Sequence, residues 1–207
     1  MTDRQLRDEV MTLFLAGHET TALTLSWAWY AITQHPEVQR KLQEEVDRVL
    51  GDRPCTMDDV PQLKYAEHIL LETFRLYPPA YIIGREAIEP CEIGGYPIEK
   101  GMTVLMAQWS MHRDPRFWDD PLEFRPERWE NDLQKRLPRI VYFPFGGGPR
   151  TCIGNTFAML EATMVLATLI QRFQFTAVPG LTVAPKATFT LKPNQPLRMI
   201  VTPRKKS

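Results

Sequence analysis

The first 35 residues have a helical pattern of apolar positions, and this pattern predicts one long helix. Apolar side chains recur at three- to four-residue spacing from Leu6 to Ile32. Thr2 can cap the start of the helix, and Pro36 disfavours helical backbone at the residue before it. The predicted helix is long for a globular protein and apolar on most sides, so we expect it to cross the middle of a domain.

Three further segments have helical patterns. Residues 36–50 begin with a proline, which suits a first helical turn, and Gly51 follows as a natural end. A third helix is expected at about residues 63–76, before two prolines, and a last one at residues 155–172. We expect the last helix to bury four apolar side chains against a core and a ligand: Phe157, Leu160, Met164 and Leu169.

Short apolar runs between turn residues predict small strands after residue 78. The expected strands are 81–83, 103–106, 173–175, 181–183 and 197–201. The chain is therefore predicted to be mainly α with small β-sheets (α+β), and at 207 residues one domain is the default and two are possible.

Composition narrows the class of protein. Lys plus Arg and Asp plus Glu both number 25, so charge gives no argument for a nucleic-acid partner. Three scattered cysteines suit a reducing, cytoplasmic compartment and not a disulfide framework. No apolar stretch has the length of a membrane span, and the first residues lack a secretory signal pattern.

The most unusual stretch is the loop FPFGGGPRTCIG at residues 143–154, which we call the Cys loop. Its three successive glycines let the backbone approach another group closely. Cys152 precedes the last predicted helix, and Arg150 adds a positive charge beside it, so a thiolate is favoured there. The alternative is a buried structural cysteine beside a turn.

The spacing Phe-x-x-Gly-x-Arg-x-Cys-x-Gly resembles the haem-ligand signature of the cytochromes P450. It is matched by Phe145, Gly148, Arg150, Cys152 and Gly154. Three other motifs of that family, AGHETT, ExxR and PERW, precede it in the family's order. The resemblance covers essentially the whole chain but only the C-terminal half of the family's fold, so we expect the N-terminal half to be absent.

The AGHETT motif lies inside the long predicted helix at residues 16–21. Small residues there would also let another helix pack closely, which is the alternative interpretation. The resemblance implies an oxygen-binding groove, in which Ala16 and Gly17 border the haem. Thr20 would then hold dioxygen and relay protons, and Glu19 would help to deliver them.

The ExxR motif places Glu72 and Arg75 one turn apart on the third helix. Such pairs are common and contribute little when they are exposed. The resemblance implies a buried ion triad of Glu72, Arg75 and Arg128, the last from PERW, with a structural role. His112 has no partner spaced for metal binding and is interpreted as structural.

The resemblance also assigns the cofactor and the substrate pocket. It implies haem b with Cys152 as thiolate ligand, and propionate contacts from Arg85 and Arg150. Without the family, Arg85 could equally be a surface strand residue. The implied pocket residues are Ala80, Tyr81, Ile82, Ile83 and Phe189.

The implied function is a haem-thiolate monooxygenase that inserts one oxygen atom from O2 into a hydrophobic organic substrate. The chain has no flavin or nicotinamide motif, so electrons would come from a separate ferredoxin or flavoprotein reductase. Lys135, Arg136 and Arg139 could dock this donor or be an ordinary solvated charge run, and the second interpretation is slightly favoured. Two alternatives stay open: an inactive remnant or non-catalytic haem-binding fragment, and an enzyme that rearranges peroxides or dehydrates its substrate.

Overall fold

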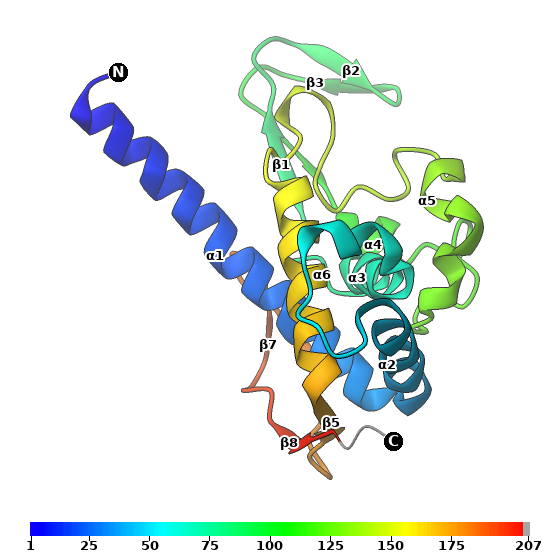
Figure 1. The fold of residues 1–207 in the computed structure, drawn as a ribbon. Helices are drawn as coiled ribbons and strands as arrows, with labels where there is room; N and C mark the ends of the chain where they lie inside the picture. The colour runs from blue at the N-terminus through cyan, green and yellow to red at the C-terminus, as the bar shows by residue number, and fades with distance from the viewer. Residues whose placement is uncertain (205–207) are drawn as a thin grey trace.

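The computed structural model describes residues 1–204, which fold into a mainly helical body with small sheets (Figure 1). The longer helices are α1 (Asp3–Gln34), α2 (Pro36–Leu50), α3 (Lys64–Leu76) and α6 (Asn155–Arg172). The short helical segments are η1 (Met57–Gln62), α4 (Gln108–Met111), η2 (Pro126–Asp132), α5 (Leu133–Arg136) and η3 (Gly148–Arg150). The predicted mainly α fold with small sheets is confirmed.

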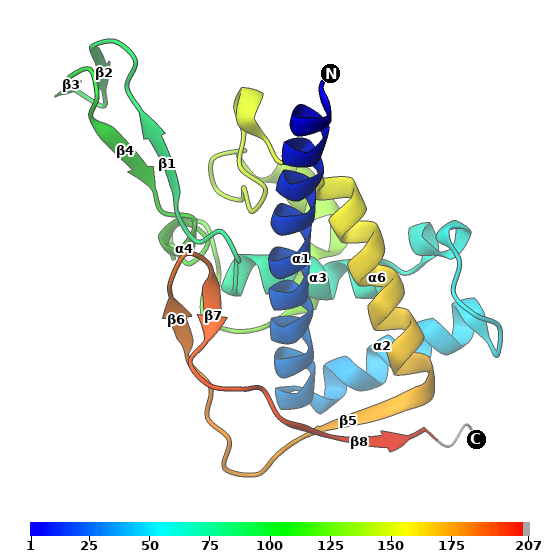
Figure 2. The same ribbon diagram turned by 90° about the vertical axis from the view of Figure 1, so that its left-hand side faces the viewer.

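The strands of the described chain pair into two-stranded antiparallel sheets. The pairs are β1 (Ile83–Glu86) with β4 (Thr103–Met106), β2 (Cys91–Ile93) with β3 (Tyr96–Ile98), β5 (Phe173–Ala177) with β8 (Met199–Pro203), and β6 (Pro185–Ala187) with β7 (Leu191–Pro193). Figure 2 shows β1 to β4 projecting from the helical body, with the β6–β7 hairpin beside α1.

The ends of the long helices are set by local chemistry that the sequence already displays. The Thr2 hydroxyl accepts a hydrogen bond from the backbone N–H of Gln5, and the Gln5 side chain accepts one from the backbone N–H of Thr2. Pro36 begins α2, and Gly51 follows its last residue with φ of 56°. The predicted bounds of α2 and α6 are confirmed.

The main core lies between the C-terminal half of α1 and helices α2, α3 and α6. Its fully buried side chains include Ile32, Leu42, Leu70, Leu166 and Ile170, and burial of each contributes about 1.5–3 kcal/mol. A second cluster lies between α3 and the segment that leads into the Cys loop. Its buried members are Leu71, Phe74, Trp118, Trp129, Val141 and Tyr142.

Only part of α1 crosses the core, which corrects the expectation for the whole helix. Residues 1–18 are exposed, and Figure 1 shows the N-terminal half of α1 projecting away from the body. The expected burial on α6 is also wrong for Phe157, whose side chain is 67% exposed. Small residues such as Ala162 and Ala167 are buried on α6 instead, because they let neighbouring helices approach closely.

Three expected strands differ from the structure. The strand expected at 81–83 begins only at Ile83, the one expected at 197–201 is β8 at Met199–Pro203, and residues 181–183 form no strand. The missed strands β6 and β7 follow that segment and enclose the turn that carries Phe189. No helix among residues 1–204 is long and apolar enough to cross a membrane.

Candidate functional site

The Cys loop is folded back on itself by its own backbone hydrogen bonds. The Cys152 N–H donates to the Phe145 carbonyl at 2.9 Å, and the Gly146 N–H donates to the Phe143 carbonyl at 2.9 Å. Gly146 and Gly148 have φ of 74° and 69°, in the left-handed region that glycine adopts at no steric cost. The glycines of the motif therefore serve the turns that bring Cys152 back beside Phe145.

The Cys152 thiol is exposed, and within residues 1–204 it forms no disulfide or hydrogen bond. The first turn of α6 begins three residues later, so the positive end of the helix dipole lies beside the cysteine. A side chain at Gly154 would bring a Cβ to 3.9 Å from the Cys152 sulfur. Two apolar side chains that follow the thiol in the sequence are also exposed, Ile153 at 87% and Phe157 at 67%.

The Cys loop contacts helix α3 and strand β1. The Phe145 ring lies 4.8 Å from the Phe74 ring, between centroids. A Cβ on Gly146 would lie 3.5 Å from the Ile83 Cδ1 atom. The loop that presents the cysteine is thus in contact with the ExxR helix and with the predicted pocket strand.

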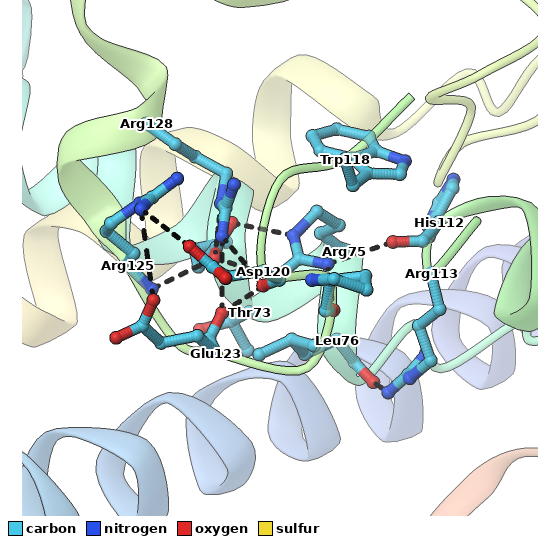
Figure 3. Close-up of polar contacts among 12 residues, drawn as sticks. Thr73, Arg75, Leu76, His112, Arg113, Trp118, Asp120, Glu123, Arg125 and Arg128 are labelled. Atoms are coloured by element: carbon cyan, nitrogen blue, oxygen red, sulfur yellow. Dashed lines mark hydrogen bonds and ion pairs between the residues drawn. The ribbon is translucent and has the colours of Figure 1, made fainter. Parts of the chain in front are cut away.

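Glu72 and Arg75 are both fully buried and form a bidentate ion pair with two hydrogen bonds of 2.9 Å. The other Arg75 donor hydrogens reach backbone carbonyls of the irregular segment (Figure 3). These acceptors are the oxygens of His112 at 2.9 Å, Pro121 at 2.6 Å and Glu123 at 2.9 Å. Every N–H group of the guanidinium therefore has a partner.

Glu72 collects further donors from the PERW segment. Arg128 donates its Nε–H to Glu72 at 2.9 Å, which brings the predicted triad together. Two donors were not predicted: the Trp129 indole N–H at 2.9 Å and the Arg125 backbone N–H at 3.0 Å. The tryptophan of PERW was visible in the sequence, but nothing in the pattern indicates where its N–H points.

His112, interpreted from the sequence as structural, supports the Cys loop through a contact that the sequence did not predict. Its Nε2 atom accepts the Phe143 N–H at 3.1 Å, and its side chain is fully buried. Burial, and then the charges of Arg113 and Arg75, lower the pKa of His112 to about 3. The ring is therefore neutral, as an acceptor must be.

The AGHETT motif presents its side chains along α1 near the β6–β7 hairpin. The Thr20 hydroxyl donates to the Ala16 carbonyl at 2.7 Å, one turn earlier. Apart from its chain neighbours and the backbone of α1 itself, no atom lies within 4 Å of a Cβ built on Gly17. Glu19 forms an ion pair with Lys192 of β7. The small residues thus border open space here, and no other helix of residues 1–204 packs against Gly17.

The predicted pocket segments lie next to each other although they are far apart in sequence. The Tyr81 hydroxyl donates to the Thr188 carbonyl at 2.8 Å, and the Leu191 N–H donates to the Pro79 carbonyl at 3.0 Å. Phe189, at the tip of the β6–β7 turn, is 96% exposed. Tyr81 and Ile83 are half-buried, whereas Ala80 and Ile82 are exposed.

The two arginines expected at the propionates are exposed. Arg85 lies on β1 opposite Val104 and donates only to the neighbouring Gly84 carbonyl, at 2.8 Å. Arg150 lies in η3 within the Cys loop. Neither guanidinium forms an ion pair with a carboxylate of the described residues. Both cations are accordingly available to an anion from outside.

The comparisons with known proteins agree with one another. The family model described as Cytochrome P450 matches residues 1–201. The chain is 42% identical over 210 positions to Protein LUTEIN DEFICIENT 5, chloroplastic, of Arabidopsis thaliana, covering 100% of this chain and 35% of that protein. It is 42% identical to Cyclooctatin synthase of Streptomyces melanosporofaciens, with 99% and 44% covered, and 39% identical to mouse Cytochrome P450 4V2, with 84% and 33% covered.

The chain therefore spans less than half the length of these relatives. The likeness extends from the start of α1 to β8, and so includes the Cys loop, the ExxR helix and the PERW segment. On this match along almost its whole length, the chain belongs to the cytochrome P450 family.

Proposed function

We propose that this chain supplies the haem-thiolate part of a monooxygenase that inserts one oxygen atom from O2 into a hydrophobic organic substrate. The observation that carries the proposal is the Cys152 thiol, exposed and without a partner among residues 1–204, on a loop connected through His112 to a buried ion cluster. An enzyme that uses cysteine as a hydrolytic nucleophile would need a basic partner such as histidine beside it. None of the described contacts gives Cys152 one.

The residues around Cys152 fit haem b. A thiol without a partner, glycine backbone and exposed apolar side chains are what a flat, mostly apolar iron macrocycle requires. The exposed guanidiniums of Arg85 and Arg150 suit the two propionates. When bound, haem with a thiolate ligand supplies dioxygen activation and favours O–O cleavage.

Residues of α1 would leave room for the bound ligand and handle protons beside it. Ala16 and Gly17 leave room beside α1 for a bound ligand. The Thr20 hydroxyl donates its hydrogen to the Ala16 carbonyl, which leaves the Oγ1 lone pairs to accept a hydrogen bond from a bound ligand or a water within the groove. Glu19 is the nearby carboxylate for proton delivery, and Lys192 holds it beside the β6–β7 hairpin.

The substrate class follows from the pocket segments. Ala80, Tyr81, Ile82, Ile83 and Phe189 present mostly apolar surface. Electrons would come from a separate ferredoxin or flavoprotein reductase. Lys135 forms an ion pair with Asp132 at 3.0 Å, which supports the interpretation of the basic run as a solvated surface rather than a docking site.

A second candidate is a haem-binding fragment without catalysis. The exposed residues 1–18 of α1 favour it, because the groove at Ala16–Thr20 is then open to water. Catalysis of this type needs a site from which water is excluded. The two candidates share haem binding through Cys152 and differ only in turnover.

A spectrum of the purified 207-residue chain with haem, reduced under carbon monoxide, tests the proposal. We expect the red-shifted Soret band of a thiolate ligand, and we expect Cys152→Ser to lose it. Cys91→Ser, at another exposed cysteine on β2, is the matched control and should keep the band. A band of the neutral thiol or histidine type in the unmodified chain, or the same band in both variants, would contradict the proposal.

A further inference from the structure

Two buried side chains of the α4 turn contact the same backbone unit of the Cys loop. Gln108 donates its Nε2–H to the Phe143 carbonyl, and His112 accepts the Phe143 N–H on Nε2 at 3.1 Å. Gln108 and His112 are both fully buried and lie four residues apart, on one face of a helical turn. Both polar backbone groups of Phe143 are therefore occupied by side chains from one short element.

We propose that Gln108 and His112 form a clamp on Phe143 that sets the position of Cys152, as positioning residues that do not touch the cofactor. The effect on a haem ligand rests on the proposed function, whereas the clamp itself does not. A side chain that accepts a backbone N–H can fix a loop that lacks regular secondary structure. Phe143 is the first residue of this loop.

Hydrogen bonds lead from the clamp to the cysteine. The Phe143 carbonyl that Gln108 contacts also accepts the Gly146 N–H at 2.9 Å. Phe145, one residue before that glycine, accepts the Cys152 N–H at 2.9 Å. A shift of the Phe143 backbone would therefore be passed to the turn that carries Cys152.

The clamp is also fixed on its other side, to the buried ion cluster. Arg75 donates to the His112 carbonyl at 2.9 Å, as Figure 3 shows. The His112 ring packs against the rings of Tyr142 and Phe143, at centroid distances of 5.1 and 5.5 Å. The neighbouring charges are cationic, from Arg75 and Arg113, and they favour the neutral ring that can accept a hydrogen bond.

A purely packing role for His112 makes a different prediction from the clamp. If only volume matters, His112→Leu should be better tolerated than His112→Gln, because it buries no unpaired amide. If the acceptor matters, the Gln side chain can offer its oxygen near the place of Nε2 and should restore the bond to Phe143. The conservative variant therefore separates the two roles.

Hydrogen exchange of the Phe143 amide in the haem-free chain tests the clamp directly. The sequence contains one Tyr–Phe dipeptide, Tyr142–Phe143, so carbonyl-13C tyrosine with 15N phenylalanine labels this amide alone in a carbonyl-to-amide NMR spectrum. We expect slow exchange in the unmodified chain and exchange at least about tenfold faster in His112→Leu. The Phe143 amide should exchange more slowly in His112→Gln than in His112→Leu.

Controls keep the outcomes distinct. His68→Leu removes a half-buried histidine of α3 outside the clamp and should leave Phe143 exchange unchanged. His112→Asn, whose shorter amide does not reach Phe143, replaces His112→Leu if that variant fails to fold. Rapid exchange of the Phe143 amide in the unmodified chain would overturn the clamp. Equal Phe143 exchange rates in His112→Gln and in the variant that lacks the acceptor, His112→Leu or His112→Asn, would also overturn it.

The carbon monoxide spectrum then separates the clamp from the proposed function. With haem, we expect the fraction of thiolate-type Soret band to fall in His112→Leu and to recover in His112→Gln. An unmodified chain that binds no haem would overturn the proposed function but leave the exchange result standing. A protected Phe143 with an unchanged thiolate band in every variant would overturn the link from clamp to Cys152.

Discussion

The buried ion cluster and the exposed face around Cys152 differ in how completely the chain satisfies their chemistry. In the cluster, Glu72 and Arg75 are fully buried and every guanidinium N–H of Arg75 has a partner. On the exposed face, the side chains of Cys152 in the Cys loop and of Phe157 in α6 are both exposed to solvent. The two regions are joined by Phe143, His112 and Arg75.

This difference supports the proposal that the face around Cys152, and not the ion cluster, binds a ligand. A buried charge is tolerated only where several donors or acceptors offset its desolvation, and these come from within the chain. A thiol, glycine backbone and apolar side chains that face outward have no such partners here. The Arg75 guanidinium is thus satisfied within the chain, whereas we propose that the face around Cys152 is completed by a bound ligand.

Removal of the shared carboxylate should have the largest effect on stability. Glu72→Gln leaves Arg75 buried without its counter-ion, and we expect a loss of about 3–5 kcal/mol in the free energy of unfolding. Glu44→Gln, which removes an exposed ion pair with Arg40, is the control and should change it by less than about 1 kcal/mol. Equal denaturant midpoints for the two variants would contradict a tightly coupled cluster.

Acid should weaken the fold through His112. Its pKa is about 3 in the folded chain, against an ordinary value of 6.5, so the unfolded chain binds more protons between these values. Stability is therefore unaffected by this group above pH 6.5 and falls by about 1.4 kcal/mol per pH unit as the pH drops towards 3.

Urea unfolding at several pH values measures this slope. His112→Gln has no titrating ring, so its stability should fall less steeply below pH 6.5. Burial also lowers the pKa of His68, so His68→Leu removes a smaller share of the slope and serves as control. Identical slopes in the unmodified chain and in His112→Gln would show that His112 is protonated in the fold.

Removal of the Trp129 indole N–H tests whether this residue stabilises the ion cluster. Trp129→Phe keeps an aromatic ring near Tyr142 but removes the donor to Glu72, and we expect a loss of about 1.5–3 kcal/mol. Trp118→Phe removes a bond to a neutral carbonyl, that of Met111, and should cost about 0.5–1.5 kcal/mol. Thermal unfolding of both variants gives the comparison, which fails if Trp118→Phe is the more damaging.

The smallest stability effect is expected on the exposed face. Phe157→Ser should change the free energy of unfolding of the haem-free chain by no more than about 0.5 kcal/mol, since the side chain is 67% exposed. The same variant should weaken haem binding in a spectral titration, because it removes apolar surface beside Cys152. Leu166→Ser, on the buried face of α6, should instead unfold the chain.

The sequence predicted the elements whose signals are local. The ends of α2 follow from Pro36 and Gly51, and the Cys loop and the ion triad follow from motifs with fixed spacing. The contacts of Trp129, Gln108 and His112 could not be predicted, because they depend on how distant segments pack.

The exposure of α1 also lies outside what periodicity can show. An apolar pattern reports that a surface can be buried, and it does not report what buries it. The absent strand at 181–183 has a similar origin, since a short apolar run forms a strand only beside a suitably placed partner. In this region of the chain the antiparallel strand pair is formed by β6 and β7.

Amide hydrogen exchange along the whole chain, with and without haem, tests the contrast between the two regions most directly. We predict strong protection of α3 and of residues 141–143 in both states. Protection of residues 145–158 and of α1 residues 10–20 should rise only when haem is added. Exchange in α3 as fast as in residues 145–158 without haem, or no gain in those residues with haem, would contradict a complete support beneath a face that a ligand completes.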